Sequence, residues 1–127
     1  MKKRNFLFII FLIYASLISM AQTKTYRQIS HKEAKEIMDS KKDILILDVR
    51  TVREFDAGHI KNAGCVPVDE IENTFKSMPI DKDKLILVYC RSGRRSKIAA
   101  QKLADMGFTN VYEFGGVLHW SYGIVRD

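Results

Sequence analysis

Two uninterrupted apolar runs dominate the pattern of hydrophobic and polar positions along the chain. Ile44–Leu47 and Leu85–Tyr89 do not alternate with polar residues, which is typical of strands buried on both faces of a parallel sheet. Two shorter runs, at 65–68 and 111–114, fit further strands, and residues 23–29 are expected to be extended. The glycine pair at 115–116 is expected to turn the chain after the last strand.

Helices are predicted between these runs, because apolar residues recur there at spacings of three and four. Ser30 and Glu33 form a capping box ahead of a helix that reaches about residue 40. Shorter helices are expected over 53–57, from 69 to Pro79, and over 117–122. A longer helix at 96–106 is expected to use Ser96 as its cap and Gly107 as its stop. Its buried face would carry Ile98, Ala99, Leu103 and Met106.

Strands that alternate with helices predict a small α/β domain with a mostly parallel central sheet. Helices must then cover both faces of that sheet, because its strands are apolar on both sides. Ligands of such folds bind beyond the carboxyl ends of the strands. The segment that follows Tyr89 is therefore the first place to look for chemistry.

The N-terminal segment has the pattern of a secretory signal peptide. Three basic residues at 2–4 precede an uncharged stretch at 6–20, and Ala21 follows Ser19 and Met20 at a suitable cleavage site. We expect a signal peptide over 1–21, and a single domain over 22–127 that is exported to the periplasm or secreted. An uncleaved membrane anchor is the alternative, although the stretch is shorter than the ~20 residues that span a bilayer. After cleavage we expect no stable membrane insertion.

The amino-acid composition argues against several classes of function. The chain has 127 residues, of which 46% are hydrophobic and 28% charged, as in one ordinary globular domain. The net charge of +6 becomes +3 once Lys2, Lys3 and Arg4 leave with the signal peptide, so a nucleic-acid partner is not expected. Two cysteines and three histidines argue against a four-ligand zinc site. We predict no metal, no cofactor and a chain small enough to be a monomer.

The segment at 90–96, with the sequence Cys-Arg-Ser-Gly-Arg-Arg-Ser, carries the candidate chemistry. A loop ahead of a helix N-terminus turns backbone N–H groups inward, and these groups together with guanidinium groups favour a thiolate. Cys90 is therefore the predicted nucleophile. The predicted binding residues for a small anion are Arg91, Ser92, Gly93, Arg94, Arg95 and Ser96. Two alternatives stay open: Cys90 is an inert buried cysteine, or Arg95 points away from the loop and forms an ion pair elsewhere.

This loop resembles the active loop of rhodanese-like sulfurtransferases. Other parts of the chain agree with that family in the expected order, so the resemblance extends from about Ile29 to Gly123. The matching residues are Asp48-Val49-Arg50, Glu54-Phe55, Gly58-His59-Ile60, Ala63 and Val66-Pro67, followed by Gly107-Phe108, Val111, Gly115-Gly116 and Trp120. The loop alone is moderately specific, and the correctly spaced combination is strong.

The resemblance implies sulfur transfer through Cys90. A small anionic donor such as thiosulfate would give its outer sulfur to Cys90, sulfite would leave, and a persulfide would form. Cyanide or a thiol would then accept that sulfur, in ping-pong fashion. The backbone N–H groups of 91–96 would surround the terminal sulfur, with Arg91 and Arg94 on the sulfonate. The alternative is a binding or sulfur-carrier module without efficient turnover.

A cysteine phosphatase is the nearest rival enzyme, because the rhodanese fold resembles that of the cell-division-cycle phosphatases. Those enzymes place an arginine six positions after the cysteine, where it clamps two phosphate oxygens. Here that position is Ser96, and the arginine falls one residue early, at Arg95. The loop is thus one residue short for phosphate and suits a sulfur atom.

The remaining polar residues are interpreted as mainly structural. We expect Arg50 to pair with Glu54 and His59 to bond to backbone, while Asp48 lies near the mouth of the site. Cys65 is expected to be a small buried residue beside a strand. A disulfide with Cys90, or a resolving role in a redox cycle, is the alternative for Cys65.

Overall fold

The computed structural model describes residues 25–127, so the predicted signal peptide lies outside the described residues. The strands in this part of the chain are β1 (Arg27–Gln28), β2 (Ile44–Asp48), β3 (Ala63–Cys65), β4 (Leu85–Cys90) and β5 (Asn110–Gly116). The helices are α2 (His31–Ser40), α3 (Val52–Ala57), α4 (Ile71–Ser77) and α5 (Arg94–Asp105), and two short 3-10 turns are η1 (Val68–Glu70) and η2 (Val117–His119). The predicted alternation of strands and helices is confirmed.

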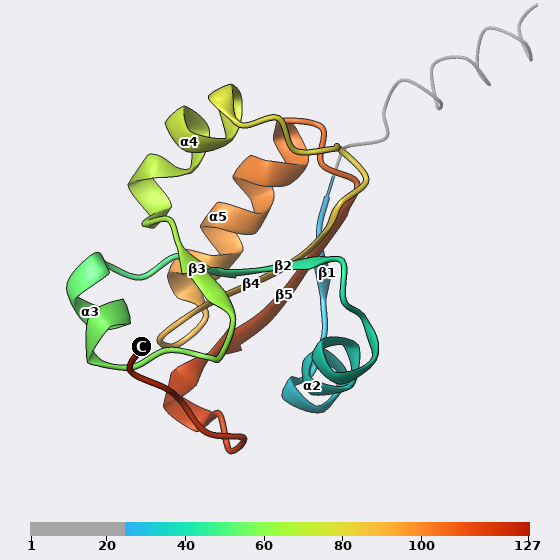
Figure 1. Ribbon diagram of the computed structural model, residues 1–127. Coiled ribbons are helices and arrows are strands. Elements are labelled where there is room, and N and C mark those ends of the chain that lie inside the picture. Colours follow the sequence, from blue (N-terminus) through green and yellow to red (C-terminus); the bar gives the residue numbers. More distant parts are fainter. Residues whose placement is uncertain (1–24) are drawn as a thin grey trace, which may run out of the picture.

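The strands form one five-stranded sheet in the order β1-β5-β4-β2-β3 (Figure 1). Every neighbouring pair in it is parallel. The two strongest apolar runs of the sequence, β2 and β4, lie side by side near the centre. This arrangement confirms the predicted α/β fold with a parallel central sheet.

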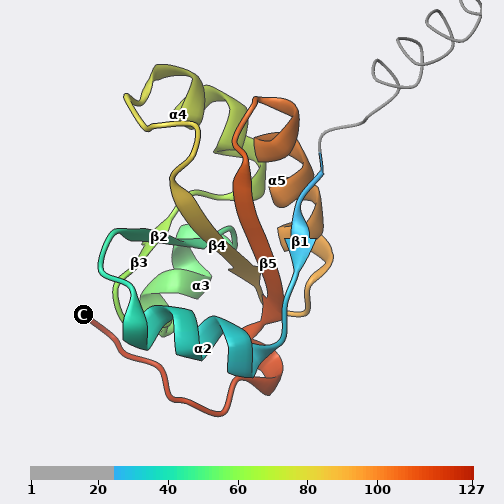
Figure 2. The same cartoon turned by 90° about the vertical axis from the view of Figure 1, so that its right-hand side faces the viewer.

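Helices cover both faces of the sheet. Helices α4 and α5 lie on one side, and α2 lies on the other (Figures 1 and 2). On the α4–α5 side, Phe75 and Leu103 belong to a core cluster with Val88 and Val111. On the α2 side, Ala34 belongs to a second cluster with residues of β2, β4 and β5. The sheet is therefore buried on both faces, as its uninterrupted apolar runs require.

Alternation along β4 decides where Cys90 points. Ile86, Val88 and Cys90 belong to the core on the α5 side, whereas Leu87 and Tyr89 belong to the core on the α2 side. Successive side chains of a strand face opposite sides of the sheet, so this division follows from the pleat. The cysteine thus leaves the carboxyl end of the central strand on the face that α5 covers.

Capping boxes begin two of the helices. The Ser30 hydroxyl accepts from the Glu33 N–H at 3.0 Å, and the Glu33 carboxylate accepts from the Ser30 N–H, which confirms the predicted start of α2. Thr51 and Glu54 form the same reciprocal pair ahead of α3. Each box satisfies backbone N–H groups that the first helical turn leaves free.

Helix α5 begins two residues earlier than the sequence suggested. Gly93 is its N-cap in the left-handed conformation, with φ of +107°, and Arg94 is its first residue. Ser96 is therefore inside the first turn and does not cap the helix, so that prediction was wrong. Ile98, placed on the buried face from its spacing, is 48% exposed; Ser96 and Ala100 lie on that face instead.

Strand β5 continues through the glycine pair that was expected to form a turn. Val88 of β4 pairs with Glu113, but Cys90 pairs with Gly116, so β5 carries one extra residue over this step. Such a β-bulge often needs a left-handed glycine, and Gly115 has φ of +86°. The bulge keeps β5 alongside the cysteine loop instead of turning it away.

The segment after η2 packs back across the molecule. His59 and Val125 exchange two backbone hydrogen bonds of 2.9 and 2.8 Å in an isolated antiparallel bridge. The C-terminus thereby comes to lie near α3 (Figure 1). In the described range 25–127, no helix has both the length and the apolar character needed to cross a membrane.

Candidate active site

The loop after β4 folds back onto the sulfur of Cys90. The Gly93 N–H donates to Cys90 Sγ with an N–S distance of 3.0 Å. Glycine suits this position because its left-handed φ of +107° is strained for other residues. The Ser96 hydroxyl oxygen lies 3.4 Å from the same sulfur. The loop thus places polar groups against Cys90 Sγ.

These polar groups set the ionisation of Cys90. Burial favours the neutral thiol, since the residue is only 1% exposed. The Ser96 hydroxyl and the backbone N–H groups of Ser96, Gly93 and Ser92 favour the thiolate. Together they outweigh burial and hold the pKa of Cys90 below its ordinary value. These contacts therefore favour the thiolate form of Cys90, and its role as the nucleophile stays a prediction.

A buried carboxylate that the sequence analysis did not single out completes the site. Glu113 of β5 is 2% exposed, and its Oε1 lies 2.7 Å from Ser96 Oγ. The same oxygen accepts from the Gly115 N–H at 2.7 Å. The available signal was an acidic residue inside an otherwise apolar strand. Only the register of β5 against β4 shows that it faces the loop.

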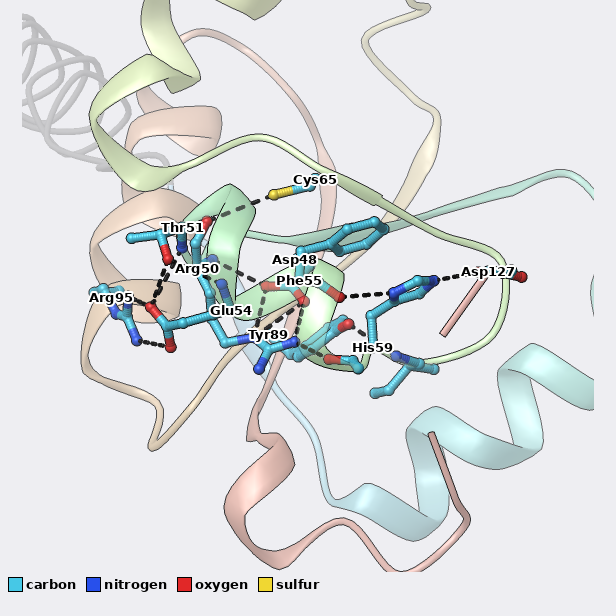
Figure 3. Close-up of polar contacts among 12 residues, drawn as sticks. Asp48, Arg50, Thr51, Glu54, Phe55, His59, Cys65, Tyr89, Arg95 and Asp127 are labelled. Atoms are coloured by element: carbon cyan, nitrogen blue, oxygen red, sulfur yellow. Dashed lines mark hydrogen bonds and ion pairs between the residues drawn. The ribbon is translucent and has the colours of Figure 1, made fainter. Parts of the chain in front are cut away.

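The three loop arginines take different positions. Arg91 and Arg94 are exposed. Arg95 instead forms a bidentate ion pair with Glu54 of α3, with N–O distances of 2.6 and 3.0 Å (Figure 3). The alternative in which Arg95 pairs away from the loop interior therefore describes the structure. This pair also corrects the expectation that Glu54 would bind Arg50.

Arg50 turns inward to Asp48 instead (Figure 3). Arg50 precedes α3, so it does not lie on the helix face from which an i,i+4 partner would reach Glu54. Its Nη2 donates to Asp48 Oδ2 and to the Gly58 carbonyl, both at 2.7 Å. Asp48 is fully buried and Arg50 is 6% exposed. The pair fixes the connection between β2 and α3.

His59 is held by backbone, as expected, and also by a residue far away in sequence. Its Nδ1–H donates to the Phe55 carbonyl at 2.9 Å, and its ring stacks on Phe55 with centroids 3.7 Å apart. Nε2 lies 2.6 Å from the Asp127 carboxylate (Figure 3). These contacts give His59 a structural role and keep it out of the cysteine loop.

Gly116 allows β5 to touch the cysteine loop. A Cβ at this position would lie 2.0 Å from the Arg91 carbonyl oxygen and 2.6 Å from the Ser92 nitrogen. No side chain fits at such distances, so this glycine is required for lack of space. The strand end therefore supports the back of the loop directly.

Cys65 ends β3 and is a free, half-buried thiol, as Cys90 is a free, buried one. Its Sγ–H donates to the Arg50 carbonyl at 3.6 Å. Burial, followed by the nearby Asp48 carboxylate, raises the pKa of Cys65 to about 11. The two thiols thus differ chemically: Cys65 is kept protonated, whereas Cys90 is prepared to ionise. Among residues 25–127, no cluster of three or more His, Cys, Asp or Glu side chains is arranged to hold a metal ion.

Comparison with known proteins identifies the family. The sequence matches the family described as "Rhodanese-like domain" over residues 30–122. Thiosulfate sulfurtransferase GlpE of Coxiella burnetii is 41% identical over 96 residues, covering 75% of this chain and 87% of that protein. Thiosulfate sulfurtransferase PspE of Escherichia coli is 32% identical over 71 residues, covering 56% of this chain and 68% of that protein.

Solved structures agree in fold. The crystal structure of a rhodanese-like domain protein from Staphylococcus aureus superimposes with a TM-score of 0.70 at 29% identity, covering 80% of this chain and 98% of that one. The sequence matches, the parallel α/β architecture and the cysteine loop point to one conclusion. The chain belongs to the rhodanese-like family and is a rhodanese-type sulfurtransferase.

Proposed function

We propose that this protein is an exported sulfurtransferase that works through a Cys90 persulfide. It takes a sulfane sulfur from thiosulfate or a similar small anionic donor and passes it to cyanide or a thiol. The observation that carries the proposal is the Gly93 N–H directed at Cys90 Sγ within a loop that favours the thiolate. A polar cradle of this kind stabilises a negative sulfur before and after the transfer.

The two half-reactions balance without a cofactor. The Cys90 thiolate attacks the outer sulfur of thiosulfate, the S–S bond of thiosulfate breaks, and sulfite leaves with that electron pair. Cys90 then carries a terminal sulfur with one negative charge, which the loop N–H groups stabilise. Cyanide or a thiolate attacks that terminal sulfur and releases the Cys90 thiolate for the next cycle.

The exposed arginines support an anionic donor. Arg91 and Arg94 are exposed, so an anionic donor arriving from solvent can reach them. Arg95 contributes differently, because Glu54 holds its guanidinium in a bidentate pair. We therefore assign donor capture to Arg91 and Arg94, and support of the loop to Arg95.

The loop geometry argues against the phosphatase alternative. Its phosphate-clamping arginine would have to direct both guanidinium nitrogens into the loop. Here the arginine is one residue early and binds Glu54, and the loop interior holds the Ser96 hydroxyl instead. Export rests on the signal-peptide pattern of residues 1–21 and is tested by sequencing the N-terminus of the secreted protein.

Intact mass spectrometry tests sulfur loading. The reduced protein is incubated with thiosulfate at neutral pH and compared with Cys90→Ser and Cys65→Ser. We expect one added sulfur atom in the wild type and in Cys65→Ser, and none in Cys90→Ser. Cyanide should remove that sulfur and yield thiocyanate at least as fast as repeated turnover.

Three outcomes would contradict parts of the proposal. Loading without repeated turnover on cyanide or thiols would favour the sulfur-carrier alternative. Loading that persists in Cys90→Ser would move the site to Cys65. No loading of the reduced wild type would exclude thiosulfate as its donor.

A further inference from the structure

Glu113, Ser96 and Cys90 form a continuous buried chain. Glu113 Oε1 lies 2.7 Å from Ser96 Oγ, which lies 3.4 Å from Cys90 Sγ. All three residues are at most 2% exposed. Such a chain connects the nucleophile to an acid on the neighbouring strand without passing through bulk water.

Counting protons along this chain limits its charge. It has two contacts, and each is a hydrogen bond only if it holds a proton. Two protons leave one negative charge, located either on Glu113 or on Cys90. Because Ser96 has a single hydroxyl proton, it can donate to only one neighbour at a time, and the carbonyl oxygens of Gly93 and Gly115, at 3.0 and 3.3 Å from its Oγ, compete for that proton. Two negative charges would leave one contact without a proton and place both charges in a buried site.

We propose that Glu113 and Cys90 share one negative charge through Ser96, so that Glu113 takes up the proton when Cys90 becomes a thiolate. The S–H bond of Cys90 breaks as an O–H bond forms on Ser96 Oγ. The original Ser96 O–H bond breaks as an O–H bond forms on Glu113 Oε1. Ser96 then donates to the sulfur anion. This inference rests on the proposed function, since it assigns the proton that the nucleophile must lose.

Within the part of the chain that the structure describes, Glu113 has no cationic side chain as a partner. Within residues 25–127 its hydrogen bonds come from Ser96 and the Gly115 N–H, and none of the ion pairs in this range includes it. By contrast, the buried Asp48 carboxylate binds Arg50 directly. A buried acid with no cation partner is suited to exchange its charge for a proton.

The other charged groups around the chain have partners or lie farther out. Arg95 on α5 interacts electrostatically with Cys90 while bound to Glu54. His31 of α2 approaches the glycine pair, since a Cβ on Gly115 would lie 3.5 Å from its Nε2. The buried Asp48–Arg50 pair closes the end of β2, and Arg91 and Arg94 are exposed. The positive charge of Arg95 should favour a negative charge on Cys90 Sγ.

Titration of the Cys90 thiolate tests the shared charge. Its ultraviolet absorbance is followed against pH in the wild type and in Glu113→Gln, with Cys90→Ser subtracted as the baseline. A glutamine oxygen can accept the same two hydrogen bonds, but it cannot take the proton. The wild type should titrate in two steps separated by a plateau, because the two acids ionise as a coupled pair. Glu113→Gln should titrate in one step.

Alkylation of Cys90 by iodoacetamide gives the size of the effect. In Glu113→Gln, the rate of alkylation should fall about tenfold for each pH unit below the midpoint of the thiol titration, as for any single thiol. The wild type should change by less than about twofold across its plateau. Ser96→Ala removes the hydroxyl that links Cys90 to Glu113 and leaves Glu113 itself unchanged. Its thiol should also titrate in one step, so this variant tests the proposal if Glu113→Gln fails to fold.

Infrared spectroscopy locates the proton. In the plateau range, the wild type should show a protonated carboxylic acid that is missing from Glu113→Gln and from Cys90→Ser. A single-step wild-type titration, or a carboxylic acid signal that persists in Cys90→Ser, would overturn the inference. None of these readouts uses a sulfur donor, so a failure to load thiosulfate would count against the proposed function alone.

Discussion

At the scale of single residues, the buried Asp48–Arg50 pair shows that the contribution of an ion pair to stability depends on its burial. Asp48 accepts from the Arg50 N–H at 2.9 Å and from its guanidinium, and both side chains are almost fully buried. Removing one partner of a buried pair leaves the other charge without compensation. Exposed pairs contribute little, because water and salt screen them.

We therefore predict that Asp48→Asn lowers the free energy of unfolding by about 3–5 kcal/mol. The matched control is Asp39→Asn, which removes an exposed ion pair with Lys35 and should cost less than about 1 kcal/mol. Urea denaturation of the two variants measures both values. Equal losses in the two variants would contradict the assignment.

The sequence singled out Cys90 and its loop as the candidate site but not all of the residues that surround Cys90. Cys90 and its loop were predictable because strand end, glycine and basic residues follow one another along the chain. Glu113 is 23 positions from Cys90 and reaches it only through the register of two strands. The expected Arg50–Glu54 pair failed for a similar reason, since Arg95 is brought to Glu54 by the packing of α5 near α3.

At the scale of elements, β5 and the cysteine loop act as one unit. The bulge at Gly115 adds a residue to β5 and brings Gly116 beside Cys90. There the strand backbone lies against the Arg91 carbonyl too closely for any side chain. The loop thus rests on the neighbouring strand as well as on the helix that follows it.

Gly116→Ala should displace the loop and abolish most sulfur transfer, because its Cβ would lie 2.0 Å from the Arg91 oxygen. The matched control is Gly64→Ala on β3, where a Cβ would have no neighbour within 4 Å. Gly64→Ala should keep its activity, with stability within about 0.5 kcal/mol of the wild type. Thiocyanate formation and thermal unfolding of both variants check this, and an active Gly116→Ala would contradict it.

Element boundaries were predicted less well than element types. The apolar runs identified β2 and β4, and the capping box identified the start of α2. The start of α5 was misplaced because a left-handed Gly93, and not a serine, ends the loop. Backbone conformation of this kind is imposed by tertiary contacts, here those with Cys90 and β5.

At the scale of the whole molecule, the fold follows from burial. Uninterrupted apolar strands need covering on both faces, and the helices between them supply that cover. The order of strands in the sheet and the return of residues 124–127 across His59 were not predictable, because no local pattern encodes them. The ion pair between Glu54 and Arg95 is another long-range link, and it makes stability depend on pH.

The hydrogen bond from Arg95, opposed in part by burial, lowers the pKa of Glu54 to about 2 from its ordinary 4.5. A carboxylate with a lowered pKa in the folded state stabilises the protein fully above about pH 4.5, and this contribution is lost as the pH falls toward 2. Glu54→Gln should therefore destabilise the protein at pH 6 and much less at pH 2.5.

Urea unfolding of wild type and Glu54→Gln at both pH values measures that difference. Glu72→Gln is the control, because Glu72 is 66% exposed and lies 3.7 Å from Lys102. Its effect should be small at both pH values. A Glu54→Gln effect that stays constant from pH 6 to pH 2.5 would show that the ion pair does not contribute as described.

The contact between Gly116 and the cysteine loop also constrains how this protein can diverge. A longer loop, such as one that could enclose a phosphate, would need extra space at the point where the backbone of β5 already touches the loop at Gly116. An inserted residue would therefore be tolerated only with a compensating change at the bulge of β5. We therefore expect the length of the cysteine loop and the bulge of β5 to change together in evolution. An insertion into the loop alone should not give this fold a new substrate.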